Sequence, residues 1–271
     1  MDMATLWQTC LQFEYDRERL VEGLDKWLGG KRDLRILDAA CGSGFPALDL
    51  IKRGYHITCA DGSESMLAAF RRNATRAGLT VVPHCVLWAD LSRYFQGEFD
   101  IVMCRGSSLI YAGAWESERM QDRSAMWEAL RSFADCVAPG GVLYVDTTSE
   151  ANLELKEPEH NTYDSRVIDG NTVELSEVVS TDHVNRVRTW KSILKINGTA
   201  HEMTRYSHFL PHSELVEMLE ACGLRNIRKE QIQGEHYTVF VAENVEDAIV
   251  PLTRENARSK QAVLTSTEVQ D

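Results

Sequence analysis

The sequence predicts an α/β fold with a doubly wound, mostly parallel sheet, and three observations lead to this prediction. Apolar strand-like runs alternate with amphipathic helix-like runs over residues 35–146, as expected for parallel strands joined by crossover helices. The apolar periodicity changes to two over residues 163–209, which predicts an antiparallel β insert. Residues 4–28 carry apolar groups at helical spacing among charges, which predicts one or two amphipathic N-terminal helices.

The alternating region supplies most of the predicted sheet. Gly29 and Gly30 end the N-terminal helices. Five strands then follow, at residues 35–38, 55–61, 81–88, 99–104 and 142–146. Helices are expected after residue 45, from residue 63 and over residues 123–137. Such alternation places helices on both faces of the sheet.

The second half of the chain forms the insert and then returns to the sheet. Asn197-Gly198 lies between two strand-like runs and is a strong hairpin signal. After Pro211, residues 212–222 are predicted to form a helix. Two further strands, at residues 227–231 and 237–242, bring the sheet to seven strands.

The composition limits the classes of function. The chain has 271 residues, 44% of them apolar, and a formal net charge of −12. These values suit a globular chain with a substantial core. Nucleic-acid binding requires clustered Lys and Arg, and no such cluster is present in the sequence. Seven cysteines, an odd number without metal-ligand spacing, predict reduced thiols and no metal site. No apolar leader or membrane-length apolar run is seen, so a cytoplasmic location without a membrane partner is expected.

A glycine-rich turn follows the first predicted strand. The chain runs from an apolar strand ending in Asp38, through Gly42 and Gly44, into a predicted helix, and Asp61 ends the next strand. The two glycines permit a tight turn and a close approach of a ligand to the backbone, while free N–H groups of the helix point to the same place. Because open α/β sheets bind ligands at the carboxyl ends of their strands, this layout predicts a nucleotide-binding pocket.

Two classes of cofactor could use this turn. The two glycines and Ala47 satisfy the dinucleotide fingerprint, with Asp61 as the ribose-binding acid. A pyrophosphate, however, requires an uncharged turn, whereas Asp38 lies at the mouth of this one and Pro46 removes one helix donor. A carboxylate there suits a cationic ligand end, such as the ammonium of S-adenosylmethionine. Asp61 can then accept hydrogen bonds from both ribose hydroxyls.

At these residues the chain resembles the class I S-adenosylmethionine-dependent methyltransferases, and among them the glycine and glycine/sarcosine N-methyltransferases. The resemblance covers roughly residues 7–240 and is strongest over residues 36–67, which read ILDAACGSGFPALDLIKRGYHITCADGSESML. It implies a Rossmann-like fold, S-adenosylmethionine as the cofactor and a small-molecule substrate.

The resemblance also implies which residues bind the cofactor. Met66 corresponds to a residue that packs on the adenine, and Arg17 to an arginine that pairs with the cofactor carboxylate, although Arg19 is an alternative. Leu87 stands where the family has a polar residue in contact with the adenine amine, so Asp90 is a possible substitute. The expected cofactor-binding set is Trp7, Arg17, Asp38, Ala40, Gly42, Gly44, Asp61, Gly62, Met66, Leu87, Trp88 and Arg105.

The methyl-acceptor side departs from the family pattern. Where the family holds a substrate carboxylate with an asparagine and an arginine, this sequence has Ser107 and Thr148. A small amine or a heteroaromatic ring nitrogen is therefore expected rather than glycine or sarcosine. His208 is the candidate general base, because the ordinary pKa of histidine lies near neutrality. The expected substrate-binding residues are Tyr15, Ser107, Thr148 and Arg205, and the expected catalytic residues are His208, Tyr206 and Tyr111.

These expectations combine into a domain plan and a function. The plan has N-terminal lid helices over residues 1–30, a Rossmann-like core over residues 31–147 and 212–244, a substrate-covering insert over residues 148–211, and a peripheral tail over residues 245–271. The expected function is methyl transfer from S-adenosylmethionine to nitrogen of a small metabolite. The alternatives are a small-molecule O-methyltransferase, an NAD-dependent oxidoreductase and a cofactor-binding protein without turnover.

Overall fold

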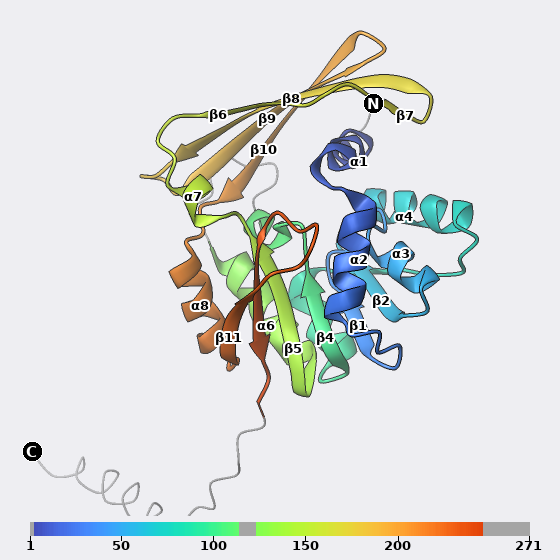
Figure 1. Cartoon of the computed structure of the whole chain (residues 1–271). Helices are drawn as coiled ribbons and strands as arrows, with labels where there is room; N and C mark the ends of the chain where they lie inside the picture. Colours follow the sequence, from blue (N-terminus) through green and yellow to red (C-terminus); the bar gives the residue numbers. More distant parts are fainter. Residues whose placement is uncertain (1–2, 114–122, 246–271) are drawn as a thin grey trace, which may run out of the picture.

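The computed structural model describes residues 3–113 and 123–245, and these residues contain two β-sheets (Figure 1). The larger sheet has seven strands in the order β11-β12-β5-β4-β1-β2-β3. The smaller has five, in the order β10-β9-β8-β6 with β7 paired to β8. This architecture, a mostly parallel sheet with an antiparallel insert, confirms the predicted fold class. Residues 246–271 of the predicted tail lie outside the described residues.

The larger sheet combines five parallel strands with an antiparallel pair. Its parallel strands are β1 (Arg35–Asp38), β2 (His56–Asp61), β3 (His84–Cys85), β4 (Phe99–Cys104) and β5 (Val137–Thr147). β12 (Thr238–Glu243) is antiparallel to both of its neighbours, β5 and β11 (Arg225–Glu230), so β11 runs in the same direction as the five parallel strands. β1 lies between β2 and β4, so its carboxyl end is central in the sheet. The strand predicted over residues 81–88 is reduced to β3, because the chain then leaves the sheet edge and forms a 3-10 helix (Trp88–Asp90).

Helices cover both faces of this sheet. On one face, α2 (Arg17–Trp27) buries Leu20 and Leu24 against Ile36 and Tyr144. On the other, two helices share a core with the opposite side chains of the strands: α6 (Ser124–Cys136) and α8 (His212–Ala221). The remaining helices of the larger unit are α3 (Ala47–Lys52), α4 (Glu64–Arg76), α5 (Leu91–Phe95), α7 (Glu150–Leu153) and the 3-10 helix Ser108–Tyr111. Within the described ranges, no helix combines the length and the apolar character that a membrane crossing requires.

The insert forms the smaller sheet, which lies above the carboxyl ends of the parallel strands (Figure 1). Its strands are β6 (Glu159–Thr162), β7 (Arg166–Ile168), β8 (Asn171–Asp182), β9 (Val187–Ile196) and β10 (Thr199–His208). The predicted hairpin joins β9 to β10: Asn197 and Gly198 both have positive φ, at 48° and 83°, as its two-residue turn requires.

Helix α1 (Met3–Glu14) lies between the insert and the larger sheet (Figure 1). One side of α1 carries Leu6, Cys10 and Phe13, spaced by three or four residues, and packs on the apolar face of the insert. The partners in the insert include Leu175 and Met203. The other side of α1 therefore faces the carboxyl edge of the larger sheet.

Candidate functional site

A cavity of about 340 Å³ lies between α1 and the carboxyl ends of β1, β2 and β4. Its wall includes most of the residues for which the sequence predicts a role in binding. Residues 8, 11 and 12 of α1 and residue 15 just after it reach the cavity, because their spacing places them on one side of the helix. The residues on the wall are Trp7, Gln8, Leu11, Gln12, Tyr15, Arg17, Asp38, Ala40, Cys41, Gly42, Ser43, Phe45, Pro46, Asp61, Ser63, Ser65, Met66, Trp88, Arg105, Gly106, Ser108 and Tyr111.

The glycine-rich turn brings the ends of β1 and β2 together. Gly42 has a φ of 49°, in the left-handed region that favours glycine, and a Cβ there would lie 3.2 Å from Met66 Cε. Its N–H donates to Asp61 Oδ2 at 2.9 Å. Asp38, at the end of β1, accepts from Ala40 N at 3.2 Å. The turn thus holds two carboxylates at one end of the cavity.

Asp61 is fixed by two backbone donors. Oδ2 accepts from Gly42 N, and Oδ1 accepts from Ser63 N at 2.8 Å. Burial raises the pKa of Asp61, and these two N–H groups oppose the rise. A carboxylate has about four acceptor positions, so each oxygen can accept a further hydrogen bond from a ligand hydroxyl.

Asp38 is buried, at 5% exposed, and lies on the cavity wall. Burial raises its pKa to about 7, while the charge of Arg105 and the Ala40 N–H act in the opposite direction. A carboxyl group with a pKa near neutrality loses its proton when a cation binds beside it, because the cation lowers that pKa. An ionised Asp38 would therefore suit a ligand with a positive end.

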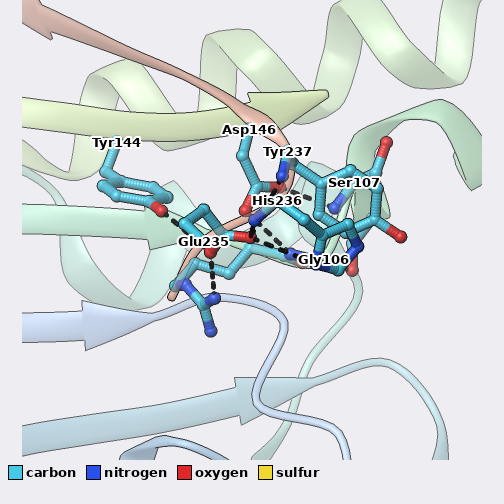
Figure 2. A network of polar contacts seen from close by, with 9 residues as sticks. Gly106, Ser107, Tyr144, Asp146, Glu235, His236 and Tyr237 are labelled. Carbon is cyan, nitrogen blue, oxygen red and sulfur yellow. Dashed lines mark hydrogen bonds and ion pairs between the residues drawn. The ribbon is translucent and has the colours of Figure 1, made fainter. Parts of the chain in front are cut away.

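Arg105 follows β4 and lies on the cavity wall. Figure 2 shows the polar network of residues that includes Tyr144, Asp146 and Glu235. The guanidinium of Arg105 forms an ion pair with Glu235, and the side chains of Arg105 and Glu235 are 6% and 1% exposed. Tyr144 donates its hydroxyl to Glu235 at 3.4 Å. Asp146 accepts from the backbone N–H groups of the residues after Arg105, Gly106 at 3.1 Å and Ser107 at 2.6 Å. Burial, reinforced by Glu235, raises the pKa of Asp146 to about 7.

The wall also carries five aromatic side chains, which are Trp7, Tyr15, Phe45, Trp88 and Tyr111. Trp7 and Tyr111 meet edge to face with ring centroids 6.5 Å apart. Tyr15 lies 5.8 Å from the ring of Phe45. Trp88 donates its indole N–H to Ala39 O at 2.6 Å, so this ring is oriented by the first strand as well as by packing. Flat apolar rings of this kind exclude water from a small-molecule site.

Arg17 lies at the rim rather than in the interior of the cavity. It is the first residue of α2, and its side chain is 42% exposed. The guanidinium stacks on Phe45 at 3.8 Å and pairs with Asp49 at 3.5 Å. The charge of Arg17 is therefore paired with Asp49, and one face of its guanidinium is covered by Phe45.

Three of the residues predicted for the cofactor lie off the cavity wall. Gly44 supports the turn from beneath: its φ is 106°, and a Cβ there would lie 2.5 Å from Leu48 Cδ1. Gly62 packs against Leu87. Leu87 itself is 63% exposed. These three residues therefore shape the turn and its border, and the structure does not bring them to the cavity.

The structure separates the predicted acceptor residues into two groups. Tyr15 and Tyr111 line the cavity. The others, which are Ser107, Thr148, Arg205, Tyr206 and His208, lie outside its wall. His208 is 2% exposed, and its Nε2 lies 3.0 Å from Ala112 O, so its ring ties β10 to the segment after Tyr111.

Arg205 lies on β10 of the insert and is fully buried. Its guanidinium lies over the ring of Trp7 at 4.1 Å and pairs with Glu177 at 3.4 Å. Its Nε donates to the Tyr111 hydroxyl at 3.4 Å. Arg205 therefore contacts two cavity residues from behind. Thr148 is likewise occupied, since its hydroxyl accepts from Arg188 Nη1 at 3.1 Å.

Sequence reasoning missed several residues of this region. Glu235 could not be paired with Arg105 because 130 positions separate them and no local pattern marks a loop residue as an ion-pair partner. Gln8, Leu11 and Gln12 were missed although a signal exists. The i, i+3, i+4 spacing that predicts the helix also groups them with Tyr15 on one side.

Comparison with known proteins places this site in a family context. Residues 36–141 match the family described as "Methyltransferase domain". The glycine/sarcosine N-methyltransferase of Halorhodospira halochloris is 33% identical over 112 residues, which are 41% of this chain and 39% of the relative. The glycine N-methyltransferase of Oryctolagus cuniculus is 27% identical over 180 residues, or 63% of this chain and 55% of the relative.

The fold has a close structural counterpart. A crystal structure of an S-adenosylmethionine-dependent methyltransferase from Clostridium acetobutylicum ATCC 824 aligns with a TM-score of 0.68 at 15% identity, covering 90% of this chain and 98% of that one. The chain spans about two-fifths of the length of the first curated relatives it matches. These matches confirm the resemblance found in residues 36–67.

Proposed function

We propose that this chain is a class I S-adenosylmethionine-dependent methyltransferase, with its matched methyltransferase domain at residues 36–141, and that it transfers a methyl group from S-adenosylmethionine to nitrogen of a small molecule. The observation that carries the proposal is the pair of carboxylates on one cavity wall, the buried Asp38 at the end of β1 and the half-buried Asp61 at the end of β2, with the glycine turn between them and Gly42 N donating to Asp61.

The two carboxylates fit the two polar ends of the donor. Asp61 retains acceptor positions on both oxygens for the ribose hydroxyls, and Asp38 provides negative charge for the ammonium. Met66 and Trp88 on the same wall offer apolar contact for the adenine. A pyrophosphate would meet the charge of Asp38 instead, which argues against a dinucleotide cofactor. When bound, S-adenosylmethionine supplies the electrophilic methyl group.

The acceptor side favours an amine or a ring nitrogen without a carboxylate. Tyr15, Tyr111 and Trp7 surround this part of the cavity. Among the described wall residues, the basic side chains are Arg17 and Arg105, and each is already paired with an acid. A carboxylate substrate such as glycine would therefore meet only cations that already have an acidic partner. Direct displacement requires only that the acceptor lone pair be held about 3 Å from the methyl carbon, in line with the breaking bond and away from water.

The insert and α1 complete the proposed enzyme. Residues 31–147 and 212–244 would form the catalytic core, with α1 and the insert at residues 148–211 closing the cavity over its carboxyl edge. The net charge of −12 argues against phosphate-rich partners. These features agree best with a cytoplasmic enzyme that acts on a small metabolite.

Three measurements test the proposal. Calorimetry should detect binding of S-adenosylmethionine and S-adenosylhomocysteine, and S-adenosylhomocysteine rather than NAD should raise the melting temperature. A panel of primary amines, imidazoles and phenols should yield methylated products whose mass fragmentation places the new methyl group on nitrogen. Methylation confined to the phenols would establish an O-methyltransferase instead. Failure of the folded protein to bind either methyl-donor compound would overturn the proposal.

A further inference from the structure

We infer, on the basis of the proposed function, that Arg105 rather than Arg17 binds the carboxylate of the methyl donor, beside Asp38 at its ammonium. The resemblance to the N-methyltransferase family implies Arg17 for this role. Three features of the structure favour Arg105: its place next to Asp38, the uncommitted donors of its guanidinium and the prior engagement of Arg17.

The first feature is the position of Arg105 relative to Asp38. β1 and β4 are neighbouring parallel strands, and Asp38 pairs with Met103. Arg105 is two residues beyond Met103, so its side chain leaves the sheet on the same face as that of Asp38. The two charges interact, since Arg105 lowers the pKa of Asp38 against the effect of burial. The amino-acid end of the donor carries an ammonium and a carboxylate on one carbon. The neighbouring carboxylate of Asp38 and guanidinium of Arg105 offer the opposite charge to each.

The second feature is the unused bonding capacity of the guanidinium. A guanidinium has five N–H donors and can serve two carboxylates at once. Arg105 Nη2 is bound to Glu235, whereas the buried Nε has no partner among the described residues. A buried donor without an acceptor is unfavourable, and a ligand carboxylate would relieve that cost after a small rotation of the side chain.

Glu235 holds this guanidinium from a rigid loop. Glu235 Oε1 accepts from the backbone N–H groups of His236 at 3.0 Å and Tyr237 at 3.3 Å. The preceding Gly234 lies directly on α2, where a Cβ would come within 2.5 Å of Leu20 N. The ion pair is therefore held in place by main-chain contacts, which makes Glu235 a positioning residue for Arg105.

The third feature is the environment of Arg17. It is stacked on Phe45 and paired with Asp49 at the rim, with 42% of its side chain exposed. An exposed and already paired guanidinium gains little from a second anion, because water screens the interaction. Arg105, at 6% exposed, interacts in a much less polar setting.

The test compares two ligands that differ only in the carboxylate. Isothermal calorimetry measures S-adenosylhomocysteine and its decarboxylated analogue, which keeps the ammonium, on the full chain and on Arg105→Met, Arg105→Lys and Arg17→Met. The unsubstituted protein should prefer S-adenosylhomocysteine by about 10- to 100-fold, the range for a charge-assisted hydrogen bond. Arg105→Met should reduce this preference to within about threefold, Arg105→Lys should keep part of it, and Arg17→Met should leave it intact.

Each result is decisive for the inference. Loss of the preference in Arg17→Met, or its survival in a folded Arg105→Met, would overturn it. Should both Arg105 variants fail to fold, Arg17→Met alone still decides, because Arg17 and Arg105 are the basic residues of the described wall. A protein that binds S-adenosylhomocysteine without any preference also refutes the inference while leaving the proposed function standing. Absence of binding to the unsubstituted protein refutes the proposed function itself.

Discussion

Replacing Asp38 by asparagine should stabilise the ligand-free protein while weakening its hold on the donor. The substitution keeps an oxygen that can accept from Ala40 N, so the turn retains its hydrogen bond. It removes a carboxyl group that is 5% exposed and whose pKa burial raises to about 7. A carboxyl that resists ionisation in the folded state is a source of instability at any pH where the unfolded chain is ionised.

The sign and size follow from the two pKa values. The carboxyl ionises near 3.8 in the absence of burial and near 7 in the folded state. Between these pH values the folded state binds the proton more tightly than the unfolded chain does. The free energy of unfolding therefore falls as the pH rises from about 4 to about 7. One pKa unit corresponds to about 1.4 kcal/mol, which gives about 4 kcal/mol above pH 7 and about 2 kcal/mol at pH 5. The Asp38→Asn variant would escape this loss, because its amide has no proton to release in this pH range.

Urea denaturation at pH 5 and at pH 8 measures the effect. The unfolding free energy of Asp38→Asn minus that of the unsubstituted protein should increase by about 2–3 kcal/mol between the two pH values. Other groups whose pKa is raised, such as Asp146, are present in both proteins, so their contributions cancel in the difference. At pH 8, calorimetry should find S-adenosylmethionine bound at least ~10-fold more weakly by the variant. A difference that stays constant with pH, or that decreases, would refute the reasoning about Asp38.

Three further substitutions test other parts of the structure. Asp61→Ala should weaken S-adenosylhomocysteine binding about 100-fold in calorimetry, because two ribose hydroxyls lose their acceptor; an unchanged affinity would remove Asp61 from the site. Gly23→Ala should lower the unfolding free energy by about 2 kcal/mol or more, although alanine favours helices, since its Cβ would come within 2.0 Å of Gln233 O; increased stability in urea would contradict this packing. His208→Phe should cost about 1–3 kcal/mol of stability through the lost contact with Ala112 O and leave S-adenosylhomocysteine affinity within about twofold; an undisturbed stability combined with lost turnover would restore the histidine as a base.

Local patterns were sufficient for most of the elements. The change of apolar period from 3.6 to 2 near residue 163 separates the two sheets, because side-chain spacing alone distinguishes helix from strand. Asn197-Gly198 set the hairpin through its backbone preference. The third strand was overextended because an apolar run does not indicate where pairing with a neighbour ends.

The grouping of the residues proposed to bind the donor could likewise be predicted from sequence. Asp38, Gly42 and Asp61 lie within one strand-turn-helix-strand unit, where chain connectivity fixes their proximity. The acceptor end could not, because its residues come from segments far apart in the chain. His208 and Arg205 lie on the expected strand. The ring of His208, however, contacts Ala112 O, and the guanidinium of Arg205 pairs with Glu177.

The sequence by itself determined the order of elements, the glycine turn and the two carboxylates that lie together on the cavity wall. Only the tertiary structure decided that Arg105 is joined to Glu235, that Arg17 is engaged at the rim, and that α1 supplies one side of the cavity. The physical reason is the range of the interactions. Periodicity, turn preferences and strand order act over a few residues, whereas burial, ion pairing and pKa depend on neighbours that only the folded chain brings together.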